Sequence, residues 1–227
     1  MKASWLWTLV GSLMVGSVGA APPLKWNDLE AIRSRAAAGE VEAQVSVGYA
    51  FETGDGYERD PAAAARWYRE AAAQGHAEAR TALAMMLLRG DGQEPDTRAA
   101  AELLRQAAAD GHAPAQYRLA QLHAAGQGVP RNAAEAARWY RSAAEGGFVP
   151  AFRAMAEAHA QGQGVGRSAA LARRWLEEGA ARGDVEAGFQ LARAAELAGA
   201  GRHDAGRLRA VRLAAGRGDI AAVLALE

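Results

Sequence analysis

The sequence contains no cysteine among its 227 residues. This absence excludes disulfides, thiolate nucleophiles and zinc sites built on cysteine. It also excludes a lipid anchor attached to an N-terminal cysteine. An exported protein without thiols suits a bacterial periplasm, where free thiols are at risk of oxidation.

Excess charge of one sign is also missing, since 26 basic residues balance 26 acidic ones. Nucleic acids and anionic membrane surfaces are bound by proteins with a basic excess. We therefore expect no nucleic-acid partner. Long apolar runs are missing beyond the N-terminal region, so we expect no integral membrane span once that region is removed. We also expect a monomer.

The N-terminal region, residues 1–20, is typical of a cleaved secretory signal. Lys2 precedes an apolar run from Trp5 to Val18, and Val18-Gly19-Ala20 supplies small residues for cleavage. The alternative is a membrane anchor, but a run of about 14 residues is shorter than the roughly 20 that span a bilayer. We expect a periplasmic or secreted protein.

What the sequence does contain is a repeat with a period of 36 residues. One glycine series and one alanine series keep this period, and a second glycine series follows it through four units. The members are Gly39, Gly75, Gly111, Gly147 and Gly183; Ala43, Ala79, Ala115, Ala151 and Ala187; and Gly54, Gly90, Gly126 and Gly162. A fixed period of this length indicates an array in which each unit buries its apolar face against its neighbours.

Each unit has the pattern of two helices joined by a glycine turn. In the first unit, helix A is predicted from Glu40 to about Glu52, with apolar residues at helical spacing. Asp60 and Pro61 then start helix B as N-cap and first helical residue. Alanine and glycine on helix A let it approach helix B closely. A charged residue at Ala79 or Ala115 is therefore expected to disrupt the stack.

The ends of the array are predicted to be caps. Residues 21–38 form a linker and a capping helix that starts at Asn27 or Asp28, and residues 39–215 form five repeats. In the fifth, the turn shifts to Gly199-Ala200-Gly201. Residues 216–227 form a half-repeat whose apolar side chains either cover the open end of repeat five or serve as a docking end; these are Ile220, Val223, Leu224 and Leu226.

The third unit carries the clearest family signature. It runs from Ala109-Asp-Gly111-His-Ala-Pro-Ala115 through Gly126-Gln-Gly128-Val129 to Ala137-Arg-Trp139-Tyr140-Arg-Ser-Ala143-Ala144. It resembles the Sel-1-like repeat family, relatives of tetratricopeptide repeats, and the resemblance covers about residues 36–215. It implies an all-α fold, a right-handed α/α superhelical solenoid of about five 36-residue helix–turn–helix repeats, used for protein–protein contact.

We predict no catalytic, cofactor-binding or metal-binding residues. The histidines at 76 and 112, and those at 123 and 159, occupy equivalent positions on successive repeats, whereas a metal site needs ligands that meet at one centre. Gly54-Asp55-Gly56 lacks the Lys-Ser/Thr of a phosphate loop and the acidic ligands of a calcium loop. We interpret it as a turn, and the tryptophans at 67, 139 and 175 as core packing.

The predicted binding surface is the inner wall of the solenoid, formed by helix A. If helix A lies as in tetratricopeptide units, its exposed inner positions are 45 and 49 and their equivalents, beginning with Val45 and Thr81. Aromatic, Met and Arg side chains, which are enriched in interfaces, occur among them. The predicted partner-binding residues are Tyr49, Met85, Tyr117, Gln121, Arg153, Glu157, Phe189 and Arg193.

The sequence therefore predicts a non-enzymatic, exported scaffold or adaptor of the bacterial cell envelope that binds a protein or peptide on its concave helix-A face. The alternative is a periplasmic immunity or inhibitor protein that blocks one toxin or enzyme. Some exported bacterial members of the family that the repeats resemble have that role. An enzyme is a third hypothesis, for which the sequence offers no catalytic set.

Overall fold

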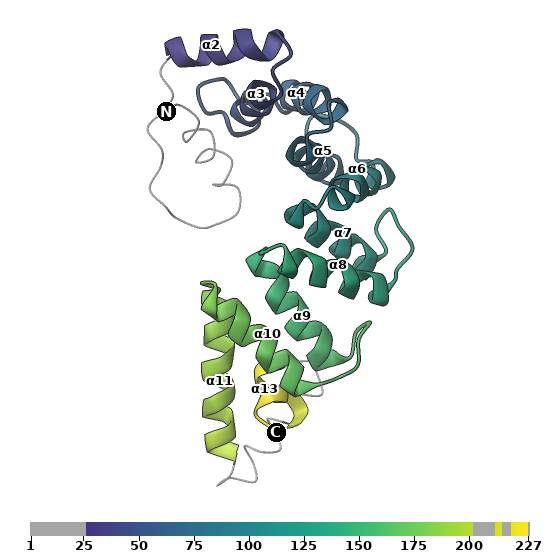
Figure 1. The fold of residues 1–227 in the computed structure, drawn as a ribbon, viewed down its shortest axis with the longest axis vertical. Coiled ribbons are helices and arrows are strands. Elements are labelled where there is room, and N and C mark those ends of the chain that lie inside the picture. Colours follow the sequence, from purple (N-terminus) through teal and green to yellow (C-terminus); the bar gives the residue numbers. More distant parts are fainter. Residues whose placement is uncertain (1–25, 202–211, 215–218, 227) are drawn as a thin grey trace. The chain divides into compact units, whose positions relative to one another are not determined.

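The computed structural model describes residues 26–201, 212–214 and 219–226. Every element within these ranges is a helix, and none of the described residues forms a strand (Figure 1). Nor does any helix in them combine the length and apolar character needed to cross a bilayer. The chain divides into two compact units, residues 1–107 and 108–227.

The helices follow one another in pairs. The first unit contains α2 (Trp26–Ala37), α3 (Val41–Thr53), α4 (Pro61–Ala73) and α5 (Ala77–Arg89), and α6 (Thr97–Ala109) ends at its boundary. The second contains α7 (Ala113–Ala125), α8 (Ala133–Glu145), α9 (Val149–Gln161), α10 (Ala169–Ala181), α11 (Val185–Gly201) and α13 (Ile220–Leu224).

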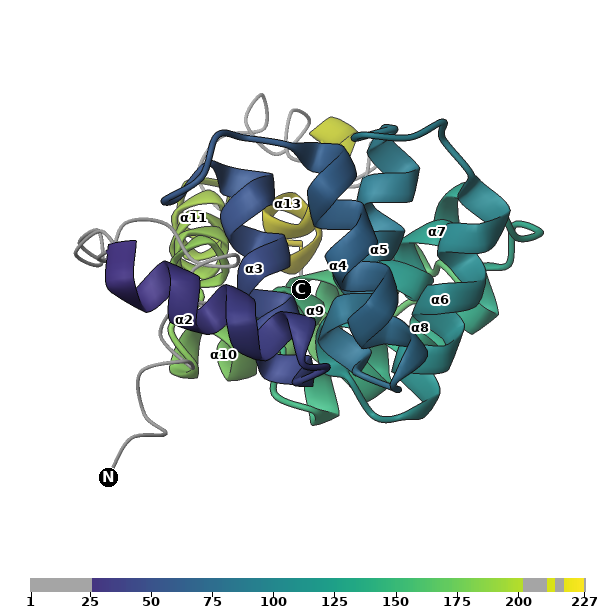
Figure 2. The ribbon, with the colours of Figure 1, turned by 90° about the horizontal axis from the view of Figure 1, so that it is seen from above.

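The predicted solenoid of helix pairs is confirmed. Within the units, α3 packs on α4, α7 on α8 and α9 on α10, and α4 and α8 then pack on the first helix of the next pair (Figure 2). Small residues allow the close approach that the sequence predicts. Ala79, Ala115 and Ala151 have no exposed surface, and a Cβ on Gly48 would lie 2.8 Å from the Tyr68 ring.

Both helix starts and helix ends follow the local sequence. Asp60, Asp96, Asn132 and Ser168 each accept a hydrogen bond from a backbone N–H in the first turn of the following helix B. Such caps pair amide groups that have no partner inside the helix. At the other end, Gly162 and its equivalents end helix A in the left-handed conformation, where glycine is favoured.

The N-terminal capping helix differs in its first turn. It begins at Trp26, so Asn27 and Asp28 lie inside α2, and the prediction of an N-cap at either residue was wrong. Helix ends fray, and a helix boundary varies by one or two residues.

The fifth repeat departs from the others at its turn. α11 has 17 residues and runs to Gly201, so the predicted loop at 199–201 was wrong. The earlier A helices have 13 residues and end at a glycine of positive φ. Ala198 occupies the equivalent position in α11, and without a glycine there the helix continues. Helix B of this repeat falls largely outside the described residues.

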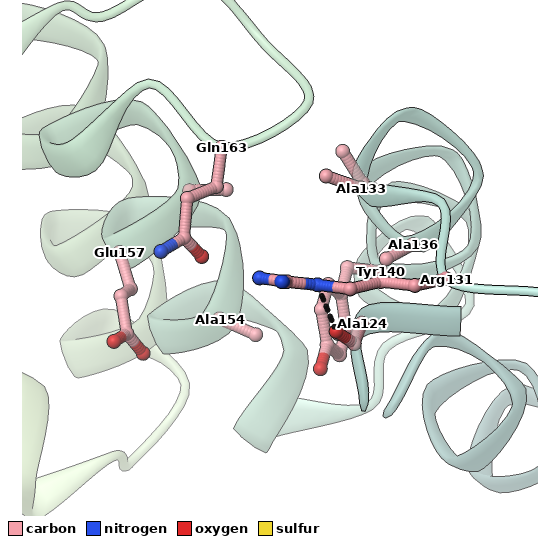
Figure 3. A pocket seen from close by; sticks show the side chains of 10 residues that line it. Ala124, Arg131, Ala133, Ala136, Tyr140, Ala154, Glu157 and Gln163 are labelled. Carbon is pink, nitrogen blue, oxygen red and sulfur yellow. Dashed lines mark hydrogen bonds between the residues drawn. The ribbon is translucent and has the colours of Figure 1, made fainter. Parts of the chain in front are cut away.

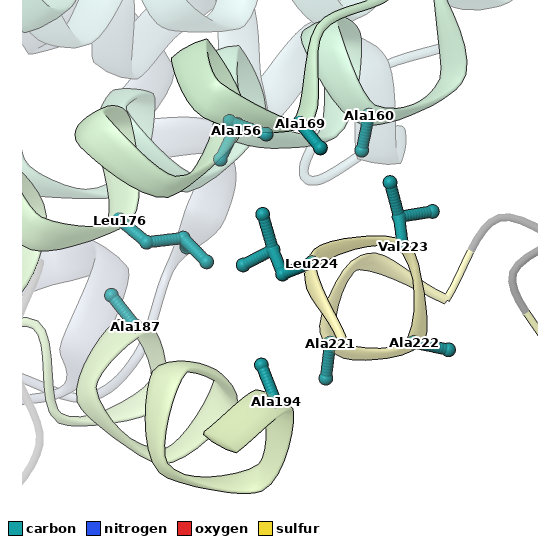
Figure 4. Packing of buried hydrophobic residues seen from close by; sticks show 11 residues of the cluster. Ala156, Ala160, Ala169, Leu176, Ala187, Ala194, Ala221, Ala222, Val223 and Leu224 are labelled. Atoms are coloured by element: carbon teal, nitrogen blue, oxygen red, sulfur yellow. The ribbon is translucent and has the colours of Figure 1, made fainter. Parts of the chain in front are cut away.

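The C-terminal helix α13 packs on α9, α10 and α11. Val223 and Leu224 are buried, and Figure 4 shows both side chains pointing into a cluster formed by these helices. Two arginines form hydrogen bonds with the ends of α13. Arg193 of α11 donates to the Asp219 carboxylate at 2.9 Å, and Arg173 of α10 donates to the Leu224 carbonyl oxygen at 2.9 Å.

Candidate functional site

In the first unit, the predicted inner wall is only partly accessible. Tyr49 and Met85 are half-buried. Val45 and Thr81 are buried, so the exposure predicted at these two positions was wrong. Val45 belongs to a cluster that includes Ala79 and Leu83 of α5, because the first helix of the next repeat covers this position.

In the second unit, Tyr117 of α7 packs against aromatic rings. Its ring centroid lies 5.4 Å from that of Tyr140 and 5.1 Å from that of Phe148. Gln121, one turn further on, accepts a hydrogen bond from Arg118 at 3.0 Å. Tyr117 thus joins its repeat to the next one, and replacing it would change stability as well as the surface.

Arg153 has a structural role that the sequence did not reveal. Its Nε donates to Asp184 Oδ2 at 2.7 Å, and Asp184 Oδ1 accepts from the backbone N–H of Ala187 at 3.1 Å. The Asp184 side chain is 5% exposed. Removing the arginine would leave a buried carboxylate without its cation, which is strongly destabilising. Arg153 is therefore a poor position at which to test binding.

Phe189 is the exposed aromatic side chain of the predicted set. It is 63% exposed and lies one turn from Val185, which is 85% exposed. Its repeat equivalents Tyr117 and Arg153 contact the start of the following repeat. Repeat five is one residue shorter than the others, so the residue expected opposite Phe189 is Asp219. Asp219 pairs with Arg193 instead, which leaves Phe189 and Val185 uncovered.

A cavity of about 230 Å³ lies between α7, α8 and α9, within the second unit. Figure 3 shows Arg131 and Glu157 on opposite sides of it, with Gln163 near Glu157. Arg131 Nε donates to the Ala124 carbonyl oxygen at 3.2 Å. The apolar lining consists mainly of alanine, with Ala124, Ala133, Ala136, Tyr140, Ala154 and Ala158. This volume is below the roughly 300 Å³ of the smallest typical ligand sites.

Burial, together with smaller contributions from Tyr117 and Glu157, raises the pKa of Tyr140 to about 12. Because this folded-state pKa exceeds the ordinary value of about 10, the tyrosine stabilises the fold fully below that value and loses its contribution as the pH rises towards about 12. We expect the melting temperature to fall more steeply in the wild type than in Tyr140→Phe between about pH 9 and about pH 11. Circular dichroism melts measure this, and superimposable pH profiles would contradict it.

The histidines take part in local structure. His76 Nδ1 accepts from the backbone N–H of Ala79 at 3.3 Å, and His159 Nδ1 lies 3.0 Å from the Gly166 carbonyl oxygen. His203 lies outside the described residues. Across the part of the chain that the structure describes, no three His, Asp or Glu side chains are grouped as metal ligands would be.

Sequence reasoning missed the cavity because its lining is mostly alanine, which also forms the scaffold. One signal was present. Position 86 is a methionine in repeat two, and its equivalent in repeat four is Ala158. A large side chain replaced by a small one at an otherwise buried position indicates space in the fold.

Comparison with known families gives four matches to the model described as "Sel1 repeat", at residues 41–76, 77–112, 113–148 and 153–184. A Sel1 repeat protein from Oxalobacter formigenes, solved by crystallography, is 33% identical over 77% of this chain and 71% of its own, with a TM-score of 0.68. A protective antigen of uropathogenic Escherichia coli strains with an SLR fold is 33% identical, with a TM-score of 0.67. That match covers 70% of this chain and 34% of the antigen. No curated protein matched the sequence.

Proposed function

Because the chain belongs to the Sel1 repeat family, whose members are generally protein-interaction scaffolds, we propose that it is an exported, non-enzymatic scaffold of the bacterial cell envelope. Its partner is a protein or an extended peptide, bound on the helix-A face. The signal-like residues 1–20 support export to the periplasm.

The observation that carries this proposal is the uncovered apolar surface of α11. Val185 and Phe189 are adjacent on one face of the helix, at i and i+4, and both are largely exposed. Exposed apolar side chains that lie together favour an interaction site over an ordinary surface. The polar end of this face is Arg193, whose side chain is 49% exposed although it binds Asp219.

Photo-crosslinking tests the proposal directly. A benzoylphenylalanine at position 189 is expected to capture one reproducible protein from the producer's own periplasm. The same group at the exposed Arg138 position should not capture it. Equal capture at both positions, or none at 189, would overturn the proposed face. A captured toxin or enzyme that loses activity on binding would identify the inhibitor role.

The double variant Val185→Ser/Phe189→Ser should weaken binding of the captured protein by at least about 10-fold, the loss expected for one of the two side chains. Burying one large apolar side chain is worth about 1.5–3 kcal/mol. Both side chains are exposed in the free protein, so the melting temperature should change little. Titration calorimetry with the purified partner measures the affinity, and Arg138→Ser serves as the control. An unchanged affinity in the double variant would contradict the prediction.

A further inference from the structure

The site that receives α13 recurs one repeat earlier in the chain. The docking surface of α13 includes Ala160 of α9, several residues of α10 and Ala194 of α11. Subtracting the 36-residue period from these positions gives residues that line the cavity between α7, α8 and α9. The equivalent pairs are Ala160 and Ala124, Ala169 and Ala133, Ala172 and Ala136, Leu176 and Tyr140, and Ala194 and Ala158.

In the first unit the same place is filled by the chain's own side chains. Met86, equivalent to Ala158, is fully buried. Glu52, equivalent to Ala124, accepts a hydrogen bond from Tyr68 at 2.9 Å and another from Arg89 at 2.8 Å. Large side chains thus occupy this junction in unit 1, and α13 occupies it between repeats four and five. Between repeats three and four, the positions equivalent to Glu52 and Met86 are the alanines Ala124 and Ala158, and the place stays open.

The polar groups around the two sites differ in charge. Arg193 binds the Asp219 carboxylate at the start of α13, and its equivalent beside the cavity is the exposed Glu157. Arg173, which donates to the last turn of α13, is replaced by Ala137. Arg131, however, lies across the cavity from Glu157 (Figure 3). An acid at one end and an arginine at the other suit a helix whose N-terminus, the positive end of its dipole, faces Glu157.

We propose that the cavity between α7, α8 and α9 binds a short helix of a partner protein. That helix presents two adjacent aliphatic side chains, as Val223 and Leu224 do for α13, and carries a lysine or arginine at its N-cap, the position of Asp219 in α13, beside Glu157. The proposal rests on the proposed scaffold function and adds the chemistry of its partner. A second copy of α13 fits poorly, because its Asp219 would lie beside Glu157.

A matched pair of peptides tests this chemistry. One has the sequence of residues 219–226, and the other has lysine in place of the aspartate at 219; both carry blocked termini. We expect the lysine peptide to shift the methyl resonances of Ala154 and Ala158 in the full chain, with an affinity about 3- to 10-fold above that of the aspartate peptide. An exposed charge pair contributes about 0.2–1 kcal/mol. Replacing the aspartate by lysine turns a repulsion into an attraction, so the two binding free energies should differ by about twice that amount. Equal affinities, or no shifts, would overturn the proposal.

Two protein variants test whether the peptide binds in the cavity or on another surface. Glu157→Arg should reverse the preference, so that the aspartate peptide binds more tightly. Ala158→Met introduces the side chain that already fills this place in the first unit, and it should abolish binding while the melting temperature stays equal or rises. Lysine-peptide binding that is unchanged by Ala158→Met would place its site elsewhere and overturn the assignment.

The same variants distinguish this proposal from the scaffold function itself. If Ala158→Met releases the protein captured at position 189, the partner's helix occupies the cavity. If Val185→Ser/Phe189→Ser releases that protein and Ala158→Met does not, the scaffold function holds and the cavity assignment fails. If position 189 captures nothing but the lysine peptide still binds as predicted, the proposed helix-A face fails and the cavity assignment holds.

Discussion

Ala79→Asp is expected to lower the free energy of unfolding by about 3–5 kcal/mol, the cost of an uncompensated buried charge. Ala79 has no exposed surface and lies in a cluster with Ala71 and Ala72 of the preceding helix α4. An aspartate is too short to carry its carboxylate past those alanines to water, as a lysine could. The variant should therefore separate α5 from α4, and urea denaturation followed by circular dichroism measures the loss.

The control for this variant is Ala170→Asp. Ala170 is exposed and also lies in the first turn of its helix, α10. A carboxylate in a first turn interacts favourably with the helix dipole, by about 0.3–1 kcal/mol. The control should consequently be neutral or slightly stabilised, which isolates burial as the cause of the loss at position 79.

The loss at position 79 should also depend on pH. Burial raises the pKa of a carboxyl group, so the destabilisation is present above the folded-state pKa and disappears below the unfolded value of about 3.9. A loss that stays the same at about pH 3 and about pH 7 would show that steric crowding, rather than charge, is responsible.

The second large effect is expected at Gly164. This glycine has φ +71°, and a Cβ on it would lie 2.0 Å from the Ala133 carbonyl oxygen at the start of α8. Gly164→Ala adds a steric collision with backbone to the cost of the left-handed conformation. Together these should amount to about 2–5 kcal/mol, from about 1–2 for the conformation and about 1–3 for overpacking.

Gly147→Ala is the matched control for Gly164. Gly147 has φ +82°, and a Cβ on it would meet nothing within 4 Å. It should therefore lose only the conformational part, about 1–2 kcal/mol. Denaturant midpoints of the two variants measured side by side give the difference. Equal losses would mean that the loop at 162–164 moves away from α8 freely, and that its packing on the preceding repeat adds nothing to stability.

The turn at Gly164 could be predicted from the sequence, but its packing could not. The recurring Gly-x-Gly predicts a turn, and a turn is found. The second glycine also lies against the start of the preceding helix B. This contact joins residues about 30 positions apart. No local pattern specifies such a contact. The same holds for the bond between Arg153 and the buried Asp184, which joins residues 31 positions apart.

The exposure of the predicted binding residues also required the packed structure. Tyr117, Arg153 and Phe189 are equivalent in the repeat, but only Phe189 is largely exposed. The difference lies in the packing of the next segment of the chain. Tyr117 and Arg153 are contacted by the next repeat, whereas α13 turns to pack on α9, α10 and α11. Position in a repeat therefore does not determine exposure at the end of an array.

The sequence by itself determined the helix pairs, the caps of the B helices and the family, because each depends on a pattern within one 36-residue unit. Glycine at positive φ, capping side chains such as Asp60, and alanines at helical spacing act locally. Tertiary structure decided which of the equivalent junctions is filled and which is open. The junction is filled by Met86 in the first unit and by α13 between repeats four and five, and it stays open at Ala158. Met86, Ala158 and α13 lie in different parts of the chain.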